Sequence, residues 1–151
     1  MTVIAYRDGV LASDSRETIK SWVDNDTCKK IFRLPDDSVI GLSGDPLGHA
    51  VLLRELRQAL KVEKRQTVLP APRLKQCHAL MVDVDGFIYV FWGTAWAILK
   101  KRHHPYYAIG SGAGAALAAM DVGASAVDAV KVAIKRDVYC GGRVQRLTIN
   151  G

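Results

Sequence analysis

The sequence contains few cysteines and no long apolar run. Its three cysteines, Cys28, Cys77 and Cys140, are odd in number, widely spaced and without a C-x-x-C pair, so neither a disulfide framework nor a zinc site is expected. No apolar stretch reaches the roughly 20 residues of a membrane-spanning helix. The N-terminal residues MTVIAYRDG lack the basic and apolar regions of a secretory signal. We therefore expect a cytoplasmic protein without a membrane partner.

Acidic residues are outnumbered by basic ones. The chain has 21 lysines and arginines against 15 acidic residues, a net charge of +6 and a sequence pI of about 9.4. This surplus permits weak attraction to nucleic acid. However, the one dense basic run, residues 100–104, precedes Pro105 and is typical of a solvated turn, and no recognition motif or aromatic stacking pattern accompanies it. A nucleic-acid-binding domain is therefore the interpretation that we place last, and no nucleic-acid partner is expected.

Strand patterns occur at the start, middle and end of the chain. Its 151 residues, of which 49% are hydrophobic, suffice for one domain over residues 1–151 with a core of its own. Asp8-Gly9 and Asp85-Gly86 are strong hairpin-turn signals between alternating stretches. The expected strands cover residues 3–7, 10–14, 26–34, 38–43, 77–84, 87–92, 94–99, 106–110 and 144–149.

Helical patterns separate these groups of strands. Asp45 can cap a helix with Pro46 at its first position, and apolar residues then follow at helical spacing to about residue 63. Residues 64–75 are expected to form a connector. Two more helices are expected, one over 113–122 and one that begins at Ser125 and ends by Gly141-Gly142. This order favours an α+β sandwich of sheets covered by helices over a regular βαβ sheet.

Six short motifs occur in an order that resembles the β subunits of proteasomes and HslV, the peptidase of a bacterial two-component ATP-dependent protease. They are Thr2 directly after Met1, ASDSR at 12–16, KKI at 29–31, LSG at 42–44, IGSG at 109–112 and RDVYCGG at 136–142. Together they span nearly the whole chain. The resemblance implies a four-layer αββα sandwich of the N-terminal nucleophile hydrolase type.

The resemblance implies that Thr2 is the nucleophile of a threonine endopeptidase. A threonine hydroxyl needs a base, and an N-terminal threonine supplies its own α-amine, with a pKa of about 7.7–8.0 in model compounds. Met1 must therefore be removed. The absence of a propeptide before Thr2 resembles the bacterial peptidase more than most proteasome β subunits. Thr2 by itself could be an ordinary second residue; the other motifs favour the nucleophile.

Lys30 and Asp14 are expected to support Thr2. The ammonium of Lys30 would lower the pKa of the α-amine and stabilise charge on the hydroxyl oxygen, while Asp14 would be its counter-ion. Adjacent strand residues point to opposite faces, and the spacing of the family motifs selects Lys30 over Lys29. A hairpin at Asp8-Gly9 pairs Val3 with Asp14, although it is four residues shorter than is usual in the family.

The remaining catalytic residues follow from the same resemblance. The N–H of Gly44 would bind the oxyanion, and Ser111 and Asp137 would hydrogen-bond near the amine. Cys140 stands where the family often has serine or threonine, which weakens that outer contact because a thiol is a poorer hydrogen-bonding group. The carbonyls of Ile134, Asp137 and Cys140 could hold a cation, as in some relatives; no cofactor is expected.

The resemblance also implies a substrate site and an assembly. Its pocket for the residue before the cut would be lined by Glu17, Cys28, Phe32, Leu42 and Pro46, which favours apolar residues, with Glu17 able to admit a basic one. The substrates would be polypeptides. The subunit would form a homo-oligomeric ring fed by a separate AAA+ unfoldase, since this sequence has no P-loop.

Two other functions remain open at the level of the sequence. The chain could be an N-terminal nucleophile amidohydrolase that cuts small amides, which would keep Thr2 and change the substrate. It could also be a catalytically silent, proteasome-like shell subunit, for which Thr2, Asp14 and Lys30 together would have no purpose. The stretch between Ser111 and Asp137 is several residues shorter than in typical relatives, which leaves the assembly geometry open.

Overall fold

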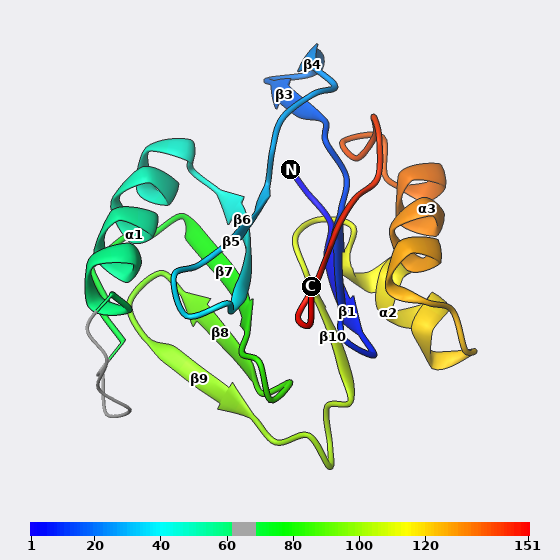
Figure 1. Cartoon of the computed structure of the whole chain (residues 1–151). Coiled ribbons are helices and arrows are strands. Elements are labelled where there is room, and N and C mark those ends of the chain that lie inside the picture. Colours follow the sequence, from blue (N-terminus) through cyan, green and yellow to red (C-terminus); the bar gives the residue numbers. More distant parts are fainter. Residues whose placement is uncertain (62–68) are drawn as a thin grey trace.

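Two antiparallel sheets lie face to face, with helices on both outer faces. The computed structural model describes residues 1–61 and 69–151, and in these ranges it contains three helices and eleven strands. Figure 1 shows four layers. Helix α1 (Pro46–Ala59) lies on a sheet formed by β5 to β9, called the second sheet; the first sheet, formed by β10, β1, β2 and β11, comes next; and helices α2 (Ala113–Asp121) and α3 (Ala126–Arg136) cover its outer face. The expected α+β, four-layer αββα sandwich is confirmed. Among the described residues, no helix is both long enough and apolar enough to span a membrane.

The first sheet carries the N-terminus. Its strands lie in the order β10 (Tyr106–Ile109), β1 (Ile4–Arg7), β2 (Val10–Ser13) and β11 (Gln145–Thr148), all antiparallel. Asp8 and Gly9 both have positive φ, 50° and 81°, as a two-residue hairpin turn requires. Arg7 pairs with Val10 as predicted. The N–H of Asp14 donates to the carbonyl of Val3 at 3.3 Å, so the hairpin returns Asp14 to the start of β1.

The second sheet is a meander of five strands. Its order is β5 (Ile31–Arg33), β6 (Val39–Gly44), β7 (Cys77–Val82), β8 (Ile88–Trp92) and β9 (Trp96–Leu99). Every neighbouring pair is antiparallel, as expected from the turn at Asp85-Gly86. The expected strand at 38–43 is confirmed within one residue at each end.

Helix α1 (Pro46–Ala59) covers the second sheet, and α2 (Ala113–Asp121) and α3 (Ala126–Arg136) cover the first. Both predicted caps are present: Asp45 accepts the N–H of Leu47, and Ser125 accepts that of Asp128. Three apolar clusters fill the spaces between the layers: one under α2 and α3, one between the sheets around Ile4 and Leu80, and one under α1 around Leu42.

Two features of the strands differ from the expectation. A hairpin of β3 (Glu17–Ile19) and β4 (Trp22–Asn25) forms a separate two-stranded sheet that the sequence analysis missed. Residues 26–30 are not part of a strand. Helix α3 ends at Arg136, before Gly141-Gly142 as expected, because Asp137 is extended and its carboxylate accepts the N–H of Tyr139.

The connector and the end of the first helix agree only in part with the expectation. Helix α1 ends at Ala59 rather than near residue 63, and residues 62–68 lie outside the described residues. The rest of the expected connector, residues 69–75, contains neither helix nor strand.

Candidate active site

Thr2 lies two residues before the start of β1, at one end of the first sheet. Its side chain is almost completely buried, with 5% of the residue exposed. Its carbonyl accepts hydrogen bonds from the N–H of Gly112 at 3.2 Å and the hydroxyl of Ser111 at 3.5 Å. Gly110, with φ of 96°, lets this turn approach closely, because a Cβ there would lie 2.1 Å from the Thr2 carbonyl oxygen. The turn at 110–112 therefore fixes where Thr2 lies.

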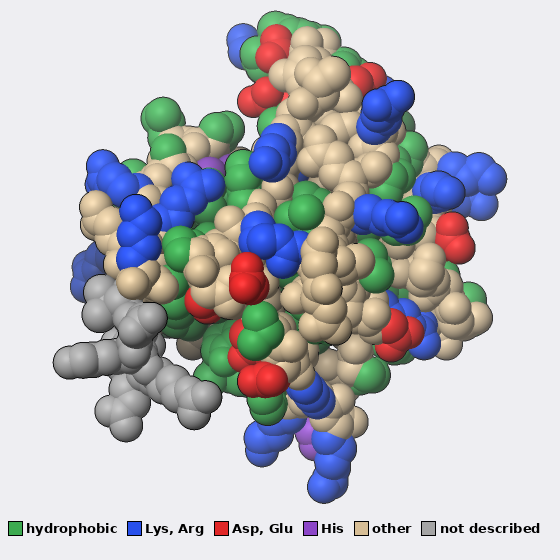
Figure 2. Space-filling model, viewed as in Figure 1, with side chains coloured by type: hydrophobic (Ala, Val, Ile, Leu, Met, Phe, Trp, Pro, Cys, Tyr) green, Lys and Arg blue, Asp and Glu red, His purple; other side chains and the backbone are tan. Residues whose placement is uncertain are grey.

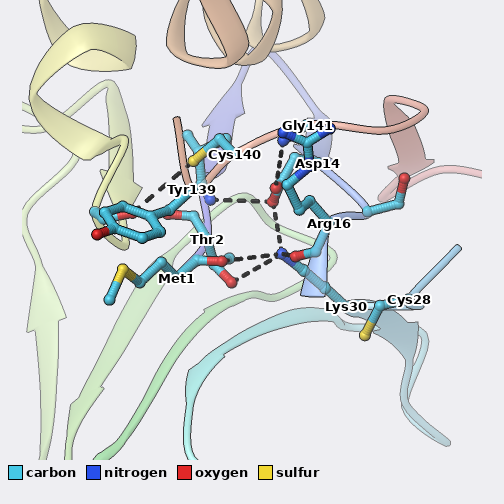
Figure 3. Close-up of polar contacts among 12 residues, drawn as sticks. Met1, Thr2, Asp14, Arg16, Cys28, Lys30, Tyr139, Cys140 and Gly141 are labelled. Carbon is cyan, nitrogen blue, oxygen red and sulfur yellow. Dashed lines mark hydrogen bonds and ion pairs between the residues drawn. The ribbon is translucent and has the colours of Figure 1, made fainter. Parts of the chain in front are cut away.

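The Lys30 ammonium is the centre of the site (Figure 3). Its Nζ lies 3.0 Å from Oγ1 of Thr2 and 2.9 Å from Oδ1 of Asp14, and it also donates to the carbonyls of Arg16 at 2.6 Å and Met1 at 3.3 Å. All four partners are acceptors, which is what a buried ammonium needs to offset its lost hydration. The expected choice of Lys30 over Lys29 agrees with this geometry, since Lys29 is exposed and its ammonium lies over the Phe32 ring.

Asp14 joins the lysine to the surrounding backbone. The residue is fully buried. Its Oδ1 accepts the N–H of Val3 at 3.2 Å besides the Lys30 ammonium, and its Oδ2 accepts the N–H of Gly141 at 3.1 Å. These donors satisfy a carboxylate that would otherwise be costly to bury. One side chain thus connects β1, Lys30 and the loop that follows α3.

Gly44 is the last residue of β6, in the second sheet. Its φ is 97°, and a Cβ there would lie 1.8 Å from the carbonyl oxygen of Gln76, so only glycine fits. Two residues earlier, the N–H of Leu42 donates to the carbonyl of Lys30 at 2.9 Å. Among the described contacts none joins Gly44 to Thr2. Any joint action of the two residues therefore requires a substrate between them.

Ser111, Asp137 and Cys140 meet beside Thr2. The Cys140 thiol lies 3.5 Å from Oδ2 of Asp137 and 3.9 Å from Oγ of Ser111. Burial alone would raise the pKa of Asp137, but hydrogen bonds from Ser111, the Tyr139 N–H and Cys140 hold it below its usual value. Burial, with the charges of Asp14 and Asp137, raises the pKa of Cys140 to about 12. At neutral pH this cluster contains an ionised carboxylate and a neutral thiol.

One of the three carbonyls of the predicted cation site already accepts a hydrogen bond. The carbonyl of Asp137 accepts the N–H of Cys140 at 3.0 Å, which occupies one of its lone pairs. Among the described residues, no group of three His, Cys, Asp or Glu side chains is placed to hold a metal ion.

The five predicted substrate residues lie in three separate places. Leu42 is 1% exposed in the core under α1, and Phe32 packs on the same cluster. Pro46 is exposed at the start of α1. Glu17 and Cys28 lie near each other, where burial and the Glu17 charge raise the pKa of the Cys28 thiol. Leu42 therefore has almost no surface to offer a substrate.

The described structure also contains a cavity of about 340 Å³ between α1 and residues 73–77. Its lining includes Asp45, Gly48 and Cys77, which are close to Gly44 in the chain or in the sheet. None of the five predicted substrate residues, all of them described, lines it.

Several residues of the site were not anticipated. Arg16 and Asp26 form a two-pronged ion pair with distances of 2.8 and 3.2 Å, and a Cβ at Gly141 would collide with the Arg16 guanidinium. The side-chain amide of Gln145 donates to the carbonyl of Cys28 and accepts the N–H of Lys30. The Arg16 contact had a signal in the ASDSR motif, whereas Gln145 had none, because its partners are backbone atoms distant in the chain.

The comparisons with known proteins identify the fold. No protein-family model matches the sequence, and no curated protein matches it significantly. Eukaryotic HslV from Trypanosoma brucei superposes with a TM-score of 0.71 at 19% identity, over 97% of this chain and 98% of that chain. BPH from Thiobacillus denitrificans gives a TM-score of 0.66 at 20% identity, over 97% of this chain and 95% of that chain.

The same BPH protein in complex with epoxomicin also matches, with a TM-score of 0.66 at 20% identity, over 97% of this chain and 96% of that chain. These likenesses cover almost the full length of both partners in each comparison. The predicted resemblance is thus confirmed at the level of the fold: this chain folds as HslV does.

Proposed function

We propose that this chain is the threonine peptidase subunit of a self-compartmentalising protease, with Thr2 as nucleophile once Met1 is removed. The observation that carries the proposal is the position of the Lys30 ammonium between Oγ1 of Thr2, at 3.0 Å, and Oδ1 of Asp14, at 2.9 Å. A buried cation beside a hydroxyl stabilises the alkoxide that forms when the hydroxyl attacks. This supports Thr2 as the reacting residue and Asp14 as the group that holds Lys30 in place.

Removal of Met1 is part of the proposal. While Met1 is attached, the nitrogen of Thr2 is an amide and cannot accept a proton. Met1 is 57% exposed, which supports its removal by an aminopeptidase. Cleavage would also take away the Met1 carbonyl, one of the four acceptors around Lys30, and put a free amine beside the Thr2 hydroxyl.

In the proposed reaction the Thr2 hydroxyl proton passes to the Thr2 α-amine, directly or through a water, while Oγ1 bonds to the carbonyl carbon of the peptide. The carbonyl oxygen becomes an oxyanion, which the N–H of Gly44 binds. The C–N bond then breaks, and the proton on the amine goes to the leaving nitrogen. Water next gives a proton to the amine and its oxygen to the acyl carbon, the Oγ1–C bond breaks, and Oγ1 recovers the proton.

Ser111 and Asp137 would assist the amine. Ser111 contacts the Thr2 carbonyl, and the Asp137 carboxylate is ionised at neutral pH because the hydrogen bonds that it accepts lower its pKa. A negative charge near the α-amine favours the protonated amine after it has accepted the hydroxyl proton. In this proposal, Ser111 and Asp137 orient and stabilise the α-amine as the base, and the Cys140 thiol donates a hydrogen bond to the Asp137 carboxylate.

We also propose that copies of the chain assemble into a ring and receive polypeptides from a separate AAA+ unfoldase in the cytoplasm. The β3–β4 hairpin supports self-association, because Ile19, Trp22 and Val23 are 44%, 53% and 45% exposed on a two-stranded ribbon, which is marginally stable alone. The hairpin, residues 17–25, carries the carboxylates of Glu17 and Asp24 and one lysine, whereas lysines and arginines are spread over the rest of the face in Figure 2. This acidic hairpin fits a basic surface of another copy.

The test of the proposed function is the intact mass of the purified protein before and after treatment with epoxomicin, a peptide epoxyketone. The reagent requires a hydroxyl and a free α-amine on one residue. We expect loss of Met1 and a single adduct, with no adduct on the Thr2→Ala protein. An adduct on both proteins, or no adduct on an assembled protein that lacks Met1, would contradict Thr2 as nucleophile. If the adduct forms on Thr2 as expected, hydrolysis assays with peptides and with small amides distinguish a peptidase from a small-amide hydrolase.

A further inference from the structure

The backbone that carries Lys30 crosses from one sheet to the other without being part of a strand. Strand β5 begins only at Ile31. On the side of the first sheet, the N–H of Cys28 donates to the carbonyl of Ser15 at 2.9 Å; on the side of the second, the carbonyl of Lys30 accepts the N–H of Leu42 at 2.9 Å. Two polar groups of this short crossing, the Cys28 carbonyl and the Lys30 N–H, still need partners.

Gln145 on β11 supplies both partners. Its Nε2 donates to the carbonyl of Cys28 at 3.1 Å, and its Oε1 accepts the N–H of Lys30 at 3.4 Å. A side-chain amide carries one donor side and one acceptor side, as a peptide group does, so Gln145 takes the place of a neighbouring strand. Because one partner is a carbonyl and the other an N–H, only one orientation of the amide satisfies both.

The position of Gln145 is itself fixed next to the site. In the register between β11 and β2, Gln145 lies opposite Ser13, the residue before Asp14. The backbone of Lys30 is therefore tied to the same end of the first sheet as the carboxylate that binds its ammonium. The carbonyl of Lys30 is at the same time tied to the strand that ends at Gly44.

We infer that Gln145 is a positioning residue, which sets Lys30 between Thr2 and Asp14 and thereby aligns the two sheets at the site. The inference rests on the proposed function for its catalytic consequence. Gln145 has no hydrogen bond to Thr2 among the described contacts and acts through Lys30. Loss of its amide leaves two backbone groups without partners and frees residues 28–30 to shift, and a displacement of about 1 Å in an active site can lower turnover about 100-fold.

The test compares Gln145→Met, which keeps the shape and removes both hydrogen bonds, with Gln145→Glu, which keeps the acceptor and loses the donor. Gln58→Met, at an exposed position on α1, is the matched control. Three quantities are measured: the hydrogen-exchange rate of the Lys30 amide by NMR, and kcat and KM for a fluorogenic peptide. We expect Gln145→Met to speed Lys30 exchange at least tenfold and to lower kcat 10- to 100-fold with KM nearly unchanged. Gln145→Glu should be intermediate, and Gln58→Met should match the wild type.

Unchanged Lys30 exchange and unchanged kcat in Gln145→Met would overturn the inference. So would a rise in KM with kcat preserved, because that would assign Gln145 to substrate binding. Exchange does not depend on peptidase activity. If the wild-type protein proves inactive, the proposed function fails, but faster exchange confined to residues 28–30 in Gln145→Met would still support the role of Gln145 in holding Lys30.

Discussion

Lys30 and Asp14 form an ion pair that is almost entirely removed from solvent. The Nζ of Lys30 lies 2.9 Å from Oδ1 of Asp14, and the two side chains are 7% and 0% exposed. A buried pair of this kind contributes little net stability compared with apolar residues, but removing one partner is costly because it leaves the other charge buried alone. The pair therefore makes Lys30 sensitive to substitution in both stability and activity.

Lys30→Ala should destabilise the fold by about 3–5 kcal/mol and lower kcat by about 100-fold or more. The reason is that Asp14 would keep only the N–H groups of Val3 and Gly141 as partners. Lys29→Ala is the neighbouring control and should change neither quantity appreciably, because Lys29 is exposed. Urea unfolding and peptide hydrolysis measure the two effects. Equal losses in the two variants would contradict the assignment of Lys30.

Two glycine substitutions compare a position where a side chain does not fit, Gly44, with one where it does, Gly114. Gly44→Ala should abolish activity and destabilise the protein, because φ is 97° and the Cβ would meet the Gln76 carbonyl oxygen at 1.8 Å. Gly114→Ala, in α2 with nothing within 4 Å of the new Cβ, should stabilise the protein by about 0.5–1 kcal/mol. Thermal unfolding measures the stability of both variants, and peptide hydrolysis measures the activity of Gly44→Ala. A Gly44→Ala protein as stable and active as the wild type would contradict the described turn and the oxyanion role.

Alkaline pH should destabilise the protein through its buried thiols. Burial raises the pKa of Cys77 to about 11 and, with nearby carboxylates, that of Cys140 to about 12. Above pH 9 the unfolded chain loses these protons while the folded chain keeps them. The unfolded state then binds fewer protons, so the free energy of unfolding falls as pH rises from about 9 to 11.

The control is a protein with Cys77→Ser and Cys140→Ser, in which this contribution is absent. Its free energy of unfolding should fall less steeply over the same pH range, because the other titrating groups are common to both proteins. Identical slopes in urea titrations would show that the two thiols are not buried as described.

The residues of the site could be predicted from the sequence where local rules apply. Asp8-Gly9 specified the hairpin, and the hairpin register then brought Asp14 to Val3. The choice of Lys30 over Lys29 came from the spacing of the family motifs and not from strand alternation, because residues 26–30 are not part of a strand. The caps of α1 and α3 followed from Asp45 and Ser125. The hairpin and the two caps depend on neighbours in the chain.

The features that were missed depend on distant contacts. Residues 26–30 resemble a strand, but their backbone reaches a neighbouring strand only at the Lys30 carbonyl, which accepts the N–H of Leu42; the other partners are Ser15 and the Gln145 side chain. The β3–β4 hairpin has exposed apolar residues without a regular polar face, so it lacked the alternation of an ordinary surface ribbon. Leu42 was placed in a substrate pocket by resemblance, whereas the depth of its burial depends on how α1 packs.

Trp22 on the β3–β4 hairpin should contribute to assembly. Its side chain is 53% exposed on a ribbon that projects from the body of the molecule. We expect Trp22→Ser to shift the sedimentation profile from a ring towards smaller species and to reduce peptidase activity in parallel. Trp92→Ser, at a similarly exposed tryptophan on β8, is the matched control and should sediment as the wild type does. A ring that persists in Trp22→Ser would place the interface elsewhere.

The most direct test of Thr2 as an N-terminal nucleophile is peptide hydrolysis by the same chain with and without Met1. Protein that retains Met1, prepared in cells with methionine aminopeptidase inhibited, would be assayed before and after treatment with that enzyme, with removal followed by intact mass. We predict no hydrolysis while Met1 is attached and activity that rises in proportion to the fraction of chains beginning at Thr2. Equal activity in the two forms would show that the α-amine of Thr2 is not the base, and would contradict the account.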